Sequence, residues 1–279
     1  MPPSKAYVIY TAYEAHRNAG FLRLLQASCT ARGIDLQLLV SEHIQPTPHE
    51  PPVFPAGIQD SRFILMRAGN ANLSRALEQM GCRVANPSVV TDIAEDKYKT
   101  YGLAKRLGIP VMETELYTPA IPLQVSFVAK PRTGKGGRGV YAVTTPEQAE
   151  SLRPILAAEP YLIQQSAAES KDLRVYVVGG EIAASILRTP QEGAFRANYS
   201  LGGNAAVMEP SDEIRAIVRT LSEFLHPDYV GFDFLFHNGQ PVLNEIEDAV
   251  GARMVYALTN INIADLYISH VAGSTASGR

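Results

Sequence analysis

Residues 231–247 read GFDFLFHNGQPVLNEIE, and this stretch decides the fold of the second half of the chain. Apolar and polar residues alternate on both sides of Asn238-Gly239, a pattern that predicts two antiparallel strands joined by a tight turn. Asn-Gly is typical of a two-residue turn, but that register would put Glu245 on the face opposite Asp233. We therefore predict a three-residue loop with Gly239 in the left-handed conformation. The buried apolar face would then consist of Phe232, Phe234, Phe236, Val242 and Ile246.

The predicted register brings three carboxylates together on the other face of this hairpin, those of Asp233, Glu245 and Glu247. Carboxylates this close repel one another unless a cation neutralises them. Oxygen ligands of this kind suit Mg²⁺, which also binds nucleotide phosphates. An acidic face in contact with solvent is the alternative interpretation, although acidic residues are uncommon within such apolar strands.

A basic, glycine-rich segment lies upstream of the hairpin. Residues 129–140 contain four basic side chains and no acidic one. The run GKGGRG at 134–139 has a predicted strand on each side, so neither a Rossmann turn nor a P-loop fits this context. A hairpin tip that folds over phosphates does fit, and Lys130 at the end of the first strand supplies a fixed positive charge. A flexible surface hairpin is the alternative interpretation.

The remaining sequence predicts two parts with different patterns. Residues 1–88 alternate strands and helices, which predicts a small α/β domain with a parallel sheet. Residues 89–272 begin with a helix over 91–107 and continue with strand-rich hairpins and few helices, an α+β pattern. Residues 273–279 are expected to form a flexible tail. The expected strands are 6–10, 34–40, 62–66, 84–85, 125–130, 140–143, 162–165, 173–178, 182–187, 230–236 and 242–247, and the other expected helices are 18–31, 72–80, 146–157 and 211–224.

The composition is that of a soluble globular protein. Of the 279 residues, 46% are hydrophobic and 19% are charged, and the net charge is −3. No apolar run approaches the roughly 18 residues that cross a bilayer, and no signal-peptide profile is present. We therefore expect a cytoplasmic protein whose partners are neither nucleic acids nor membranes, with homo-oligomerisation left open. Cys29 and Cys82, without a CxxC motif, predict neither a disulfide framework nor a thiolate metal site.

Three further side chains are candidate substrate contacts because of their positions. Tyr13 and Arg67 follow N-terminal strands, at the end where parallel sheets place their ligand loops. Arg253 follows the acidic strand, where its guanidinium could hold a substrate carboxylate through two hydrogen bonds. An ion pair between Arg253 and either Asp248 or Glu247 is the alternative.

Taken in order, the motifs resemble those of the ATP-grasp superfamily, in particular RimK-type and glutathione-synthetase-like carboxylate–amine ligases. The resemblance covers residues 86–255 and implies an N-terminal α/β domain followed by an α+β ATP-grasp fold. The two lobes of that fold, residues 89–163 and 164–272, would sandwich ATP. The segments that carry the resemblance are Asp96-Lys97, Val128–Pro131 with the glycine run, 163–166 (IQQS), Asp172–Arg174, Arg188, 195–198 (FRAN) and the acidic hairpin.

The same resemblance implies roles for individual residues. It implies catalytic roles for Lys130, Arg196 and Asn198, metal binding by Asp233, Glu245 and Glu247, and a substrate contact for Arg188. Gln165 stands where Glu is usual in the family, and Glu247 stands where Asn is usual. The residues implied to contact the nucleotide are Lys97, Lys130, Gly134, Gly136, Gly137, Gly139, Gln164, Gln165, Ser166, Asp172, Arg174 and Arg196.

The implied reaction joins a carboxylate to an amine on an amino acid or small peptide. The carboxylate takes the γ-phosphoryl group of ATP, and the amine attacks the acyl phosphate to give an amide, ADP and phosphate. The implied cofactors are ATP and two Mg²⁺ ions, with Mn²⁺ as a substitute. An ATP-grasp phosphotransferase and a non-catalytic nucleotide sensor are the alternative functions.

Overall fold

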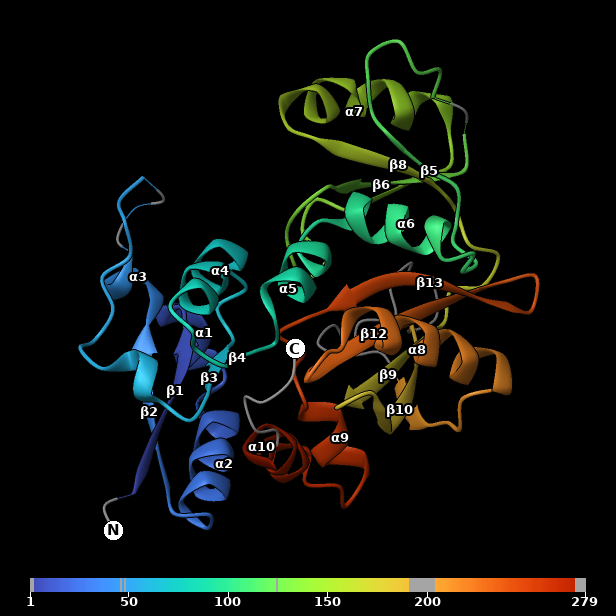
Figure 1. The fold of residues 1–279 in the computed structure, drawn as a ribbon. Coiled ribbons are helices and arrows are strands. Elements are labelled where there is room, and N and C mark those ends of the chain that lie inside the picture. The colour runs from blue at the N-terminus through green and yellow to red at the C-terminus, as the bar shows by residue number, and fades with distance from the viewer. Residues whose placement is uncertain (1–2, 46, 48, 124, 191–203, 274–279) are drawn as a thin grey trace.

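The structure is a computed structural model that describes residues 3–45, 47, 49–123, 125–190 and 204–273. Three β-sheets organise these residues (Figure 1). We call them the N-terminal sheet, the lid sheet and the C-terminal sheet, in chain order. None of the helices within the described ranges combines the length and the apolar character that crossing a membrane requires.

The N-terminal sheet is parallel and has the strand order β2-β1-β3-β4. Helices connect its strands, as the alternating pattern of residues 1–88 predicts. The strands are β1 (Ser4–Tyr10), β2 (Ile34–Val40), β3 (Ile64–Met66) and β4 (Val84–Ala85). The helices are α1 (Ala12–Arg17), α2 (Ala19–Thr30), α3 (Ser41–Ile44), the 3₁₀ helix η1 (Ile58–Asp60) and α4 (Ala71–Gln79).

Two helices, α5 (Ser88–Ala94) and α6 (Lys97–Arg106), follow where the sequence predicted one helix over 91–107. The prediction of a single helix is wrong because Asp96 interrupts it. Asp96 has extended backbone angles, and its carboxylate accepts hydrogen bonds from the backbone N–H groups of Tyr98 and Lys99. A side chain that caps a helix in this way starts a new helix. Lys97 therefore becomes the first residue of α6.

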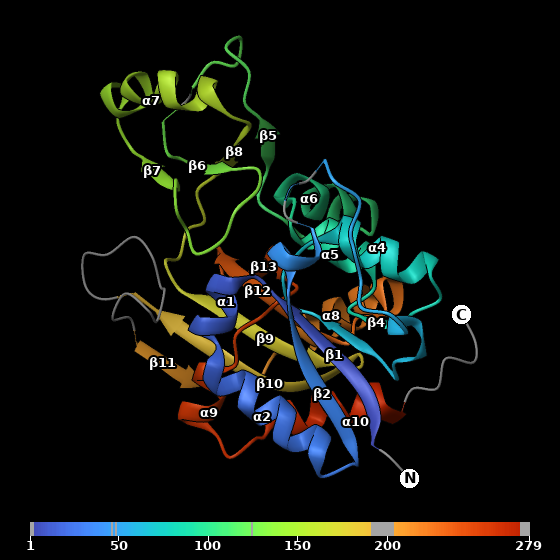
Figure 2. The same cartoon turned by 90° about the vertical axis from the view of Figure 1, so that its left-hand side faces the viewer.

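The lid sheet is antiparallel, with the strand order β5-β8-β6-β7. Its strands are β5 (Thr114–Leu116), β6 (Phe127–Pro131), β7 (Tyr141–Val143) and β8 (Tyr161–Gln165). Helix α7 (Pro146–Ala158) begins with a capping box formed by Thr145 and Gln148 and buries its apolar side against this sheet. The loop between β6 and β7 carries the glycine run and extends from the sheet toward the rest of the molecule (Figure 2).

The C-terminal sheet is antiparallel, with the strand order β11-β10-β9-β12-β13. Its strands are β9 (Asp172–Val178), β10 (Glu181–Thr189), β11 (Asn204–Val207), β12 (Tyr229–His237) and β13 (Gln240–Glu247). Helix α8 (Asp212–Leu225) covers one face, where Leu221 packs with Phe232 and Phe234. An α/β N-terminal part followed by an α+β part is the predicted fold class, and it is confirmed.

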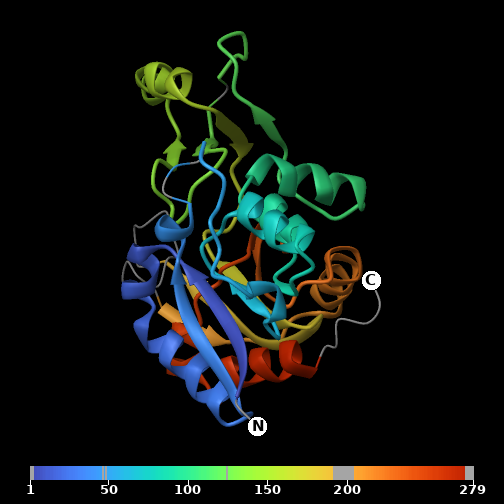
Figure 3. The ribbon, with the colours of Figure 1, turned by 60° about the vertical axis from the view of Figure 1, so that its left-hand side comes forward.

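The other face of the C-terminal sheet shares a hydrophobic core with the N-terminal part. Tyr176 and Tyr229 belong to one cluster with Leu25 of α2 and with α9 (Arg253–Leu258) and α10 (Ile263–Gly273). Helices α2 and α10 lie side by side (Figure 1, Figure 3), and Arg32 bonds to both Asp265 and Ser269. The predicted boundary at residue 88 therefore falls between parts that pack closely together, and it stays a prediction. Of the predicted tail, Gly273 is the last residue of α10, and residues 274–279 lie outside the described residues.

The hairpin between β12 and β13 differs from the prediction at its turn. His237 pairs with Gln240, so the loop has two residues, and Asn238 and Gly239 have φ angles of 54° and 79°. These left-handed angles fit a type I′ turn, so the predicted three-residue loop is wrong. A β-bulge at Asn244 then shifts the register, and Asp233 still pairs with Glu245. Leu243 rather than Val242 joins the phenylalanine face, since Leu243 pairs with Phe234.

Candidate active site

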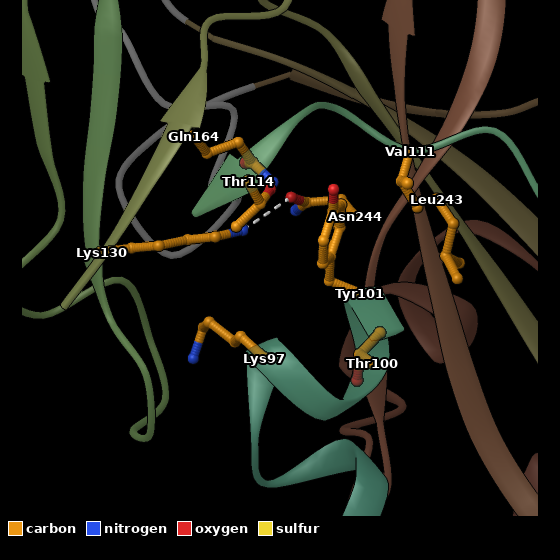
Figure 4. Close-up of a pocket in the computed structure, with 9 residues that line it drawn as sticks. All are labelled: Lys97, Thr100, Tyr101, Val111, Thr114, Lys130, Gln164, Leu243 and Asn244. Atoms are coloured by element: carbon orange, nitrogen blue, oxygen red, sulfur yellow. Dashed lines mark hydrogen bonds between the residues drawn. The ribbon is translucent and has the colours of Figure 1, made fainter. Parts of the chain in front are cut away.

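A small pocket lies where the lid sheet, helix α6 and the edge of the C-terminal sheet meet (Figure 4). Leu243 donates its backbone N–H to the carbonyl of Pro110, which ties the segment before β5 to strand β13 beside the pocket. The lining residues are Lys97, Thr100, Tyr101, Val111, Thr114, Lys130, Gln164, Leu243 and Asn244.

Lys130 extends from β6 into this pocket and is only 4% exposed. Its Nζ donates a hydrogen bond to Oδ1 of Asn244 at 3.2 Å. Burial lowers the pKa of Lys130 to about 8, while nearby Glu245 opposes this shift and Lys97 adds to it. The pocket therefore holds a desolvated ammonium group that an anionic ligand would stabilise.

Lys97 reaches the same pocket from the first turn of α6. Its Nζ donates to the carbonyl oxygen of Gly134 at 2.7 Å, so Lys97 contacts the start of the glycine run. The residue before it, Asp96, is paired with Arg132 at 2.6 Å, and the backbone N–H of Lys97 donates to the carbonyl of Arg132. The base of the glycine loop is therefore fixed to the beginning of α6.

The glycine loop is the hairpin connection that the sequence predicted. Gly134, Gly136, Gly137 and Gly139 have φ angles of 111°, 73°, 72° and 68°, values that side chains disfavour. A Cβ at Gly139 would also lie 2.9 Å from the side chains of Pro131 and Tyr161. Three of these glycines allow the turn, and Gly139 in addition allows a close approach to β6. Movement of the loop over a nucleotide stays a prediction.

The end of β8 contributes one of its three predicted nucleotide contacts to the pocket. Gln164 is buried, and its Nε2 donates to Oγ1 of Thr114 at 2.9 Å. Gln165 is exposed and Ser166 is half-buried, and neither lines the pocket. The amide of Gln164 is thus oriented by a side chain of the neighbouring strand β5.

A cluster of charged side chains covers the polar part of the C-terminal sheet, on the face that carries Asp233. Arg174 donates from Nε and Nη2 to the two carboxylate oxygens of Asp233, at 2.7 and 2.6 Å. It also contacts Glu247 at 2.8 Å. Arg188 bridges Asp172 and Asp233, with an Nη2–Oδ2 distance of 2.9 Å to Asp233. The cluster is therefore a connected network of buried and half-buried charges that satisfy one another.

This network fixes the protonation state of Asp233. Burial raises the pKa of the Asp233 carboxyl, but the guanidinium groups of Arg174 and Arg188 outweigh burial and hold the pKa at about 2. Asp233 is therefore ionised at neutral pH although the side chain is only 4% exposed.

The three predicted metal ligands lie on one face of the hairpin, but arginine side chains already bind the carboxylates of two of them, Asp233 and Glu247. Asp233 and Glu245 occupy directly opposite positions of β12 and β13, and Glu247 follows on the same face of β13. Within the described ranges, no three His, Cys, Asp or Glu side chains are grouped so that they could hold a metal ion. The metal site therefore stays a prediction, and the observed partners of Asp233 and Glu247 are arginines.

Two predicted catalytic residues, Arg196 and Asn198, lie outside the described residues. Arg188, predicted to face the substrate, is buried in the charged network instead of lining the pocket. Tyr13 is 70% exposed on α1, far from being enclosed. Arg253 is exposed at the start of α9 and forms no ion pair with any described residue. The alternative partner Asp248 accepts hydrogen bonds from Asn86 and Thr91.

Arg67 is enclosed by protein groups on several sides. Its Nη2 donates to the carbonyl of Val250 at 2.7 Å, and its guanidinium lies 5.5 and 5.4 Å from the ring centroids of Phe21 and Tyr229. These contacts connect the segment after β3 to α2, to β12 and to the segment that follows the acidic strand. In this structure Arg67 therefore binds the N-terminal part to the C-terminal part.

The sequence did not predict several pocket residues. Thr100, Tyr101, Thr114 and Asn244 were missed. Only Asn244 gave a signal that could have been used, because a polar amide interrupts the apolar alternation of β13 where the bulge occurs. Thr114 lies in a three-residue strand that is too short for a periodic pattern.

Comparison with known proteins identifies the family to which this chain belongs. The model of the RimK-like ATP-grasp domain matches residues 94–271. A Klebsiella pneumoniae protein named probable alpha-L-glutamate ligase is 32% identical over 209 residues, which cover 71% of this chain and 70% of that protein. A protein of the same name from Methanococcoides burtonii is 26% identical over 279 residues, covering 92% of each.

Among solved structures, the RimK domain protein ATP-grasp from Sphaerobacter thermophilus superposes with a TM-score of 0.74 at 19% identity, over 95% of this chain and 99% of that one. This likeness concerns the fold, and the family match and the relatives concern the chemistry. The chain belongs to the RimK-like ATP-grasp family and is an ATP-dependent carboxylate–amine ligase.

Proposed function

We propose that the pocket at Lys97 and Lys130 holds the phosphates of ATP, with the glycine loop above them. The observation that carries this proposal is that two lysines from different elements, Lys97 of α6 and Lys130 of β6, line one pocket (Figure 4). Neither lysine forms an ion pair with any part of the chain that the structure describes. A desolvated cation without a carboxylate partner favours an anionic ligand. Gln164, Gln165 and Ser166 would then lie toward the adenosine.

We further propose that Mg²⁺ is held by Asp233, Glu245 and Glu247, with two ions bound and Mn²⁺ able to replace them. The donor set suits the ion, because all three groups offer carboxylate oxygens and lie on one face of the sheet. Each oxygen has two lone pairs, so an oxygen that accepts a hydrogen bond from Arg174 retains one for a cation. Bound Mg²⁺ would neutralise charge on the phosphates.

The residues of this chain would act mainly through charge and position. Lys97 and Lys130 would stabilise the negative charge of the phosphoryl group during its transfer to the carboxylate, and the resemblance implies the same task for Arg196 and Asn198. The glycine loop would keep water away from the acyl phosphate, which water would otherwise hydrolyse. The amine would then attack, and phosphate would leave.

For the substrates, we propose that one is L-glutamate and that the other is an amino acid or short peptide. The names of the two relatives support this choice. Arg253, exposed beyond the acidic strand, is the side chain best placed among the substrate candidates to hold a carboxylate, and Tyr13 is the candidate on the opposite part. Residues 1–88 would form the domain that completes the acceptor site, next to lobes 89–163 and 164–272.

ADP formation tests this proposal. The protein is incubated with Mg-ATP and L-glutamate, alone and with each of a panel of amino acids and dipeptides, and products are identified by mass spectrometry. We expect ADP and amide in equal amounts, with ADP formation dependent on the amine. ADP formation that needs no amine and leaves a stable phosphorylated product would instead assign a phosphotransferase.

The pKa of Lys130 predicts a pH dependence of ATP binding. Because burial lowers this pKa to about 8, the free enzyme loses the positive charge as pH rises through 8, and the KM for ATP should rise. The expected increase approaches about tenfold per pH unit above 8, since the charged fraction falls at that rate. In Lys130→Arg the guanidinium stays charged, so the KM should not follow this profile. Parallel KM profiles from pH 7 to pH 9.5 would contradict the assignment.

Substitution of the acidic strand should change the Mg²⁺ requirement. Glu245→Gln should raise the Mg²⁺ concentration for half-maximal ADP formation by at least about tenfold, because it removes the charge of an expected ligand. Glu247→Asn should change it much less, since Asn keeps a ligand oxygen and is the family's usual residue. A Mg²⁺ titration of both variants that matches wild type would show that this face binds no cation.

A further inference from the structure

Lys135, the lysine inside the glycine run, does not belong to the phosphate pocket. Its Nζ lies 2.6 Å from Oε1 of Glu95, the residue that follows helix α5. Lys97 and Lys130 line the pocket, whereas Lys135 does not. The loop thus has contacts in two directions, with Gly134 bonded to Lys97 and Lys135 bonded to Glu95.

The ion pair of Glu95 and Lys135 packs directly against the N-terminal part of the chain. A Cβ built on Gly69, in the loop after β3, would lie 2.7 Å from Oε1 of Glu95 and 2.8 Å from Nζ of Lys135. Gly69 also has a φ angle of 63°, which favours glycine. A side chain at residue 69 would force the ends of these two side chains to shift. Three separate segments therefore meet at one point: the loop after β3, the end of α5 and the glycine loop.

From this contact we propose that Glu95 is a positioning residue for the glycine loop. Through Lys135 it holds the loop closed over the phosphate pocket, and the backbone at Gly69 connects that closed position to the N-terminal part. The inference rests on the proposed nucleotide site. The functional consequence of this contact is that the loop excludes water most completely when the N-terminal part is docked at Glu95. The acyl phosphate then reacts with the amine instead of being hydrolysed.

The expected size of the effect follows from the exposure of the pair. The side chains of Lys135 and Glu95 are 51% and 27% exposed. Ion pairs of this kind contribute little to the stability of a fold, and their loss changes a local equilibrium by up to about fivefold. Removing the pair should therefore open the loop without unfolding the protein.

The test compares wild type with Glu95→Gln, Lys135→Gln and the charge-reversed double variant Glu95→Lys/Lys135→Glu. The first readout is the rate of tryptic cleavage after the exposed Arg138 in nucleotide-free protein, followed by mass spectrometry. Each single variant should be cleaved roughly two- to fivefold faster than wild type. The second readout is the ratio of ADP to amide, which should rise in the single variants because water enters. The double variant should return both readouts toward wild type.

A matched control is Lys99→Gln, which removes the ion pair with Asp92 between α6 and α5. In that pair Nζ of Lys99 lies 2.7 Å from Oδ2 of Asp92, and the two side chains are 43% and 37% exposed. The pair does not involve the glycine loop. Gly69→Ala is a second approach. Its Cβ should displace the ion pair of Glu95 and Lys135 while both charges remain, so tryptic cleavage after Arg138 should again be faster than in wild type.

The proposal is overturned if Glu95→Gln is cleaved after Arg138 at the wild-type rate, or if the double variant behaves like the single variants. A wrong assignment of the nucleotide site would give a different result. In that case Mg-ATP would not protect Arg138 in wild type, whereas the comparison of nucleotide-free proteins would still report the contact.

Discussion

Replacement of Lys130 by Met is expected to lower the ATP-dependent rate by about 10²- to 10³-fold, the usual cost of removing one group that stabilises transition-state charge. The ammonium of Lys130 is buried and reaches the pocket with one hydrogen bond, to Asn244. Met has a similar length and no charge, so it removes the cation while filling the same space. The measurement is kcat/KM for ADP formation, with Tm recorded for each protein.

The protein should remain folded, because replacing a desolvated ammonium by an apolar side chain removes a cost of burial. Lys105→Met is the matched control. Lys105 is exposed and paired with Glu113 outside the pocket, so its loss should leave the rate within about twofold, since exposed pairs contribute little. A Lys130→Met protein that keeps a rate within tenfold of wild type would contradict the role of Lys130 as the phosphate-binding cation.

Asp233→Asn is expected to destabilise the protein by about 3 kcal/mol, the lower part of the range for breaking a buried ion pair. Asp233 accepts hydrogen bonds from both Arg174 and Arg188, and all three side chains are buried. An amide offers one acceptor oxygen and places N–H donors against guanidinium donors. Calorimetry should show a fall in Tm of roughly 5–10 °C.

The pH dependence of that loss has a defined direction. The pKa of Asp233 is about 2 in the folded protein and lies below its unfolded value, near 3.9. Its ionisation therefore contributes stability that is complete above about pH 4 and is lost as pH falls toward 2. Wild type should lose stability more steeply than Asp233→Asn over this interval. Asp265→Asn, which breaks the partly exposed pair with Arg32, is the control and should cost less than about 1 kcal/mol. Equal Tm values for Asp233→Asn and wild type would refute the network as a stabilising unit.

Periodicity and local chemistry predicted most strands and the longer helices. The parallel α/β pattern of residues 1–88 and the hairpin around Asn238-Gly239 depend on neighbours in sequence, which one sequence displays. The turn was mispredicted because a bulge at Asn244 shifts the register as an extra loop residue would. The short elements β5, β11, α1 and α3 were missed, since three to six residues carry no period. Helices α9 and α10 were also missed, and their burial depends on a core shared with α2.

The sequence predicted which residue types form the candidate site, but not which side chains pair with one another there. The resemblance identified Lys97, Lys130 and the acidic strand, and the structure brings both lysines to one pocket. The pairing of Arg174 with Glu247 was not predictable, because it joins strands β9 and β13, which are not neighbours in the sheet. The contact of Lys135 with Glu95 was not predictable either, because it depends on how the glycine loop folds back on the end of α5.

Covalent labelling by an ATP analogue tests the central claim most directly. An ATP whose γ-phosphate carries an activated acyl group transfers that acyl group to amines beside the bound phosphates. Peptide mapping by mass spectrometry then identifies the labelled lysines. We predict labelling of Lys130 and Lys97 that excess Mg-ATP prevents. Lys105 and Lys171, whose ammonium lies over the ring of Phe236, do not line the pocket and should be labelled only to the background level. Labelling of Lys105 or Lys171 that ATP prevents, with Lys97 and Lys130 unmodified, would contradict the proposal that this pocket holds the phosphates.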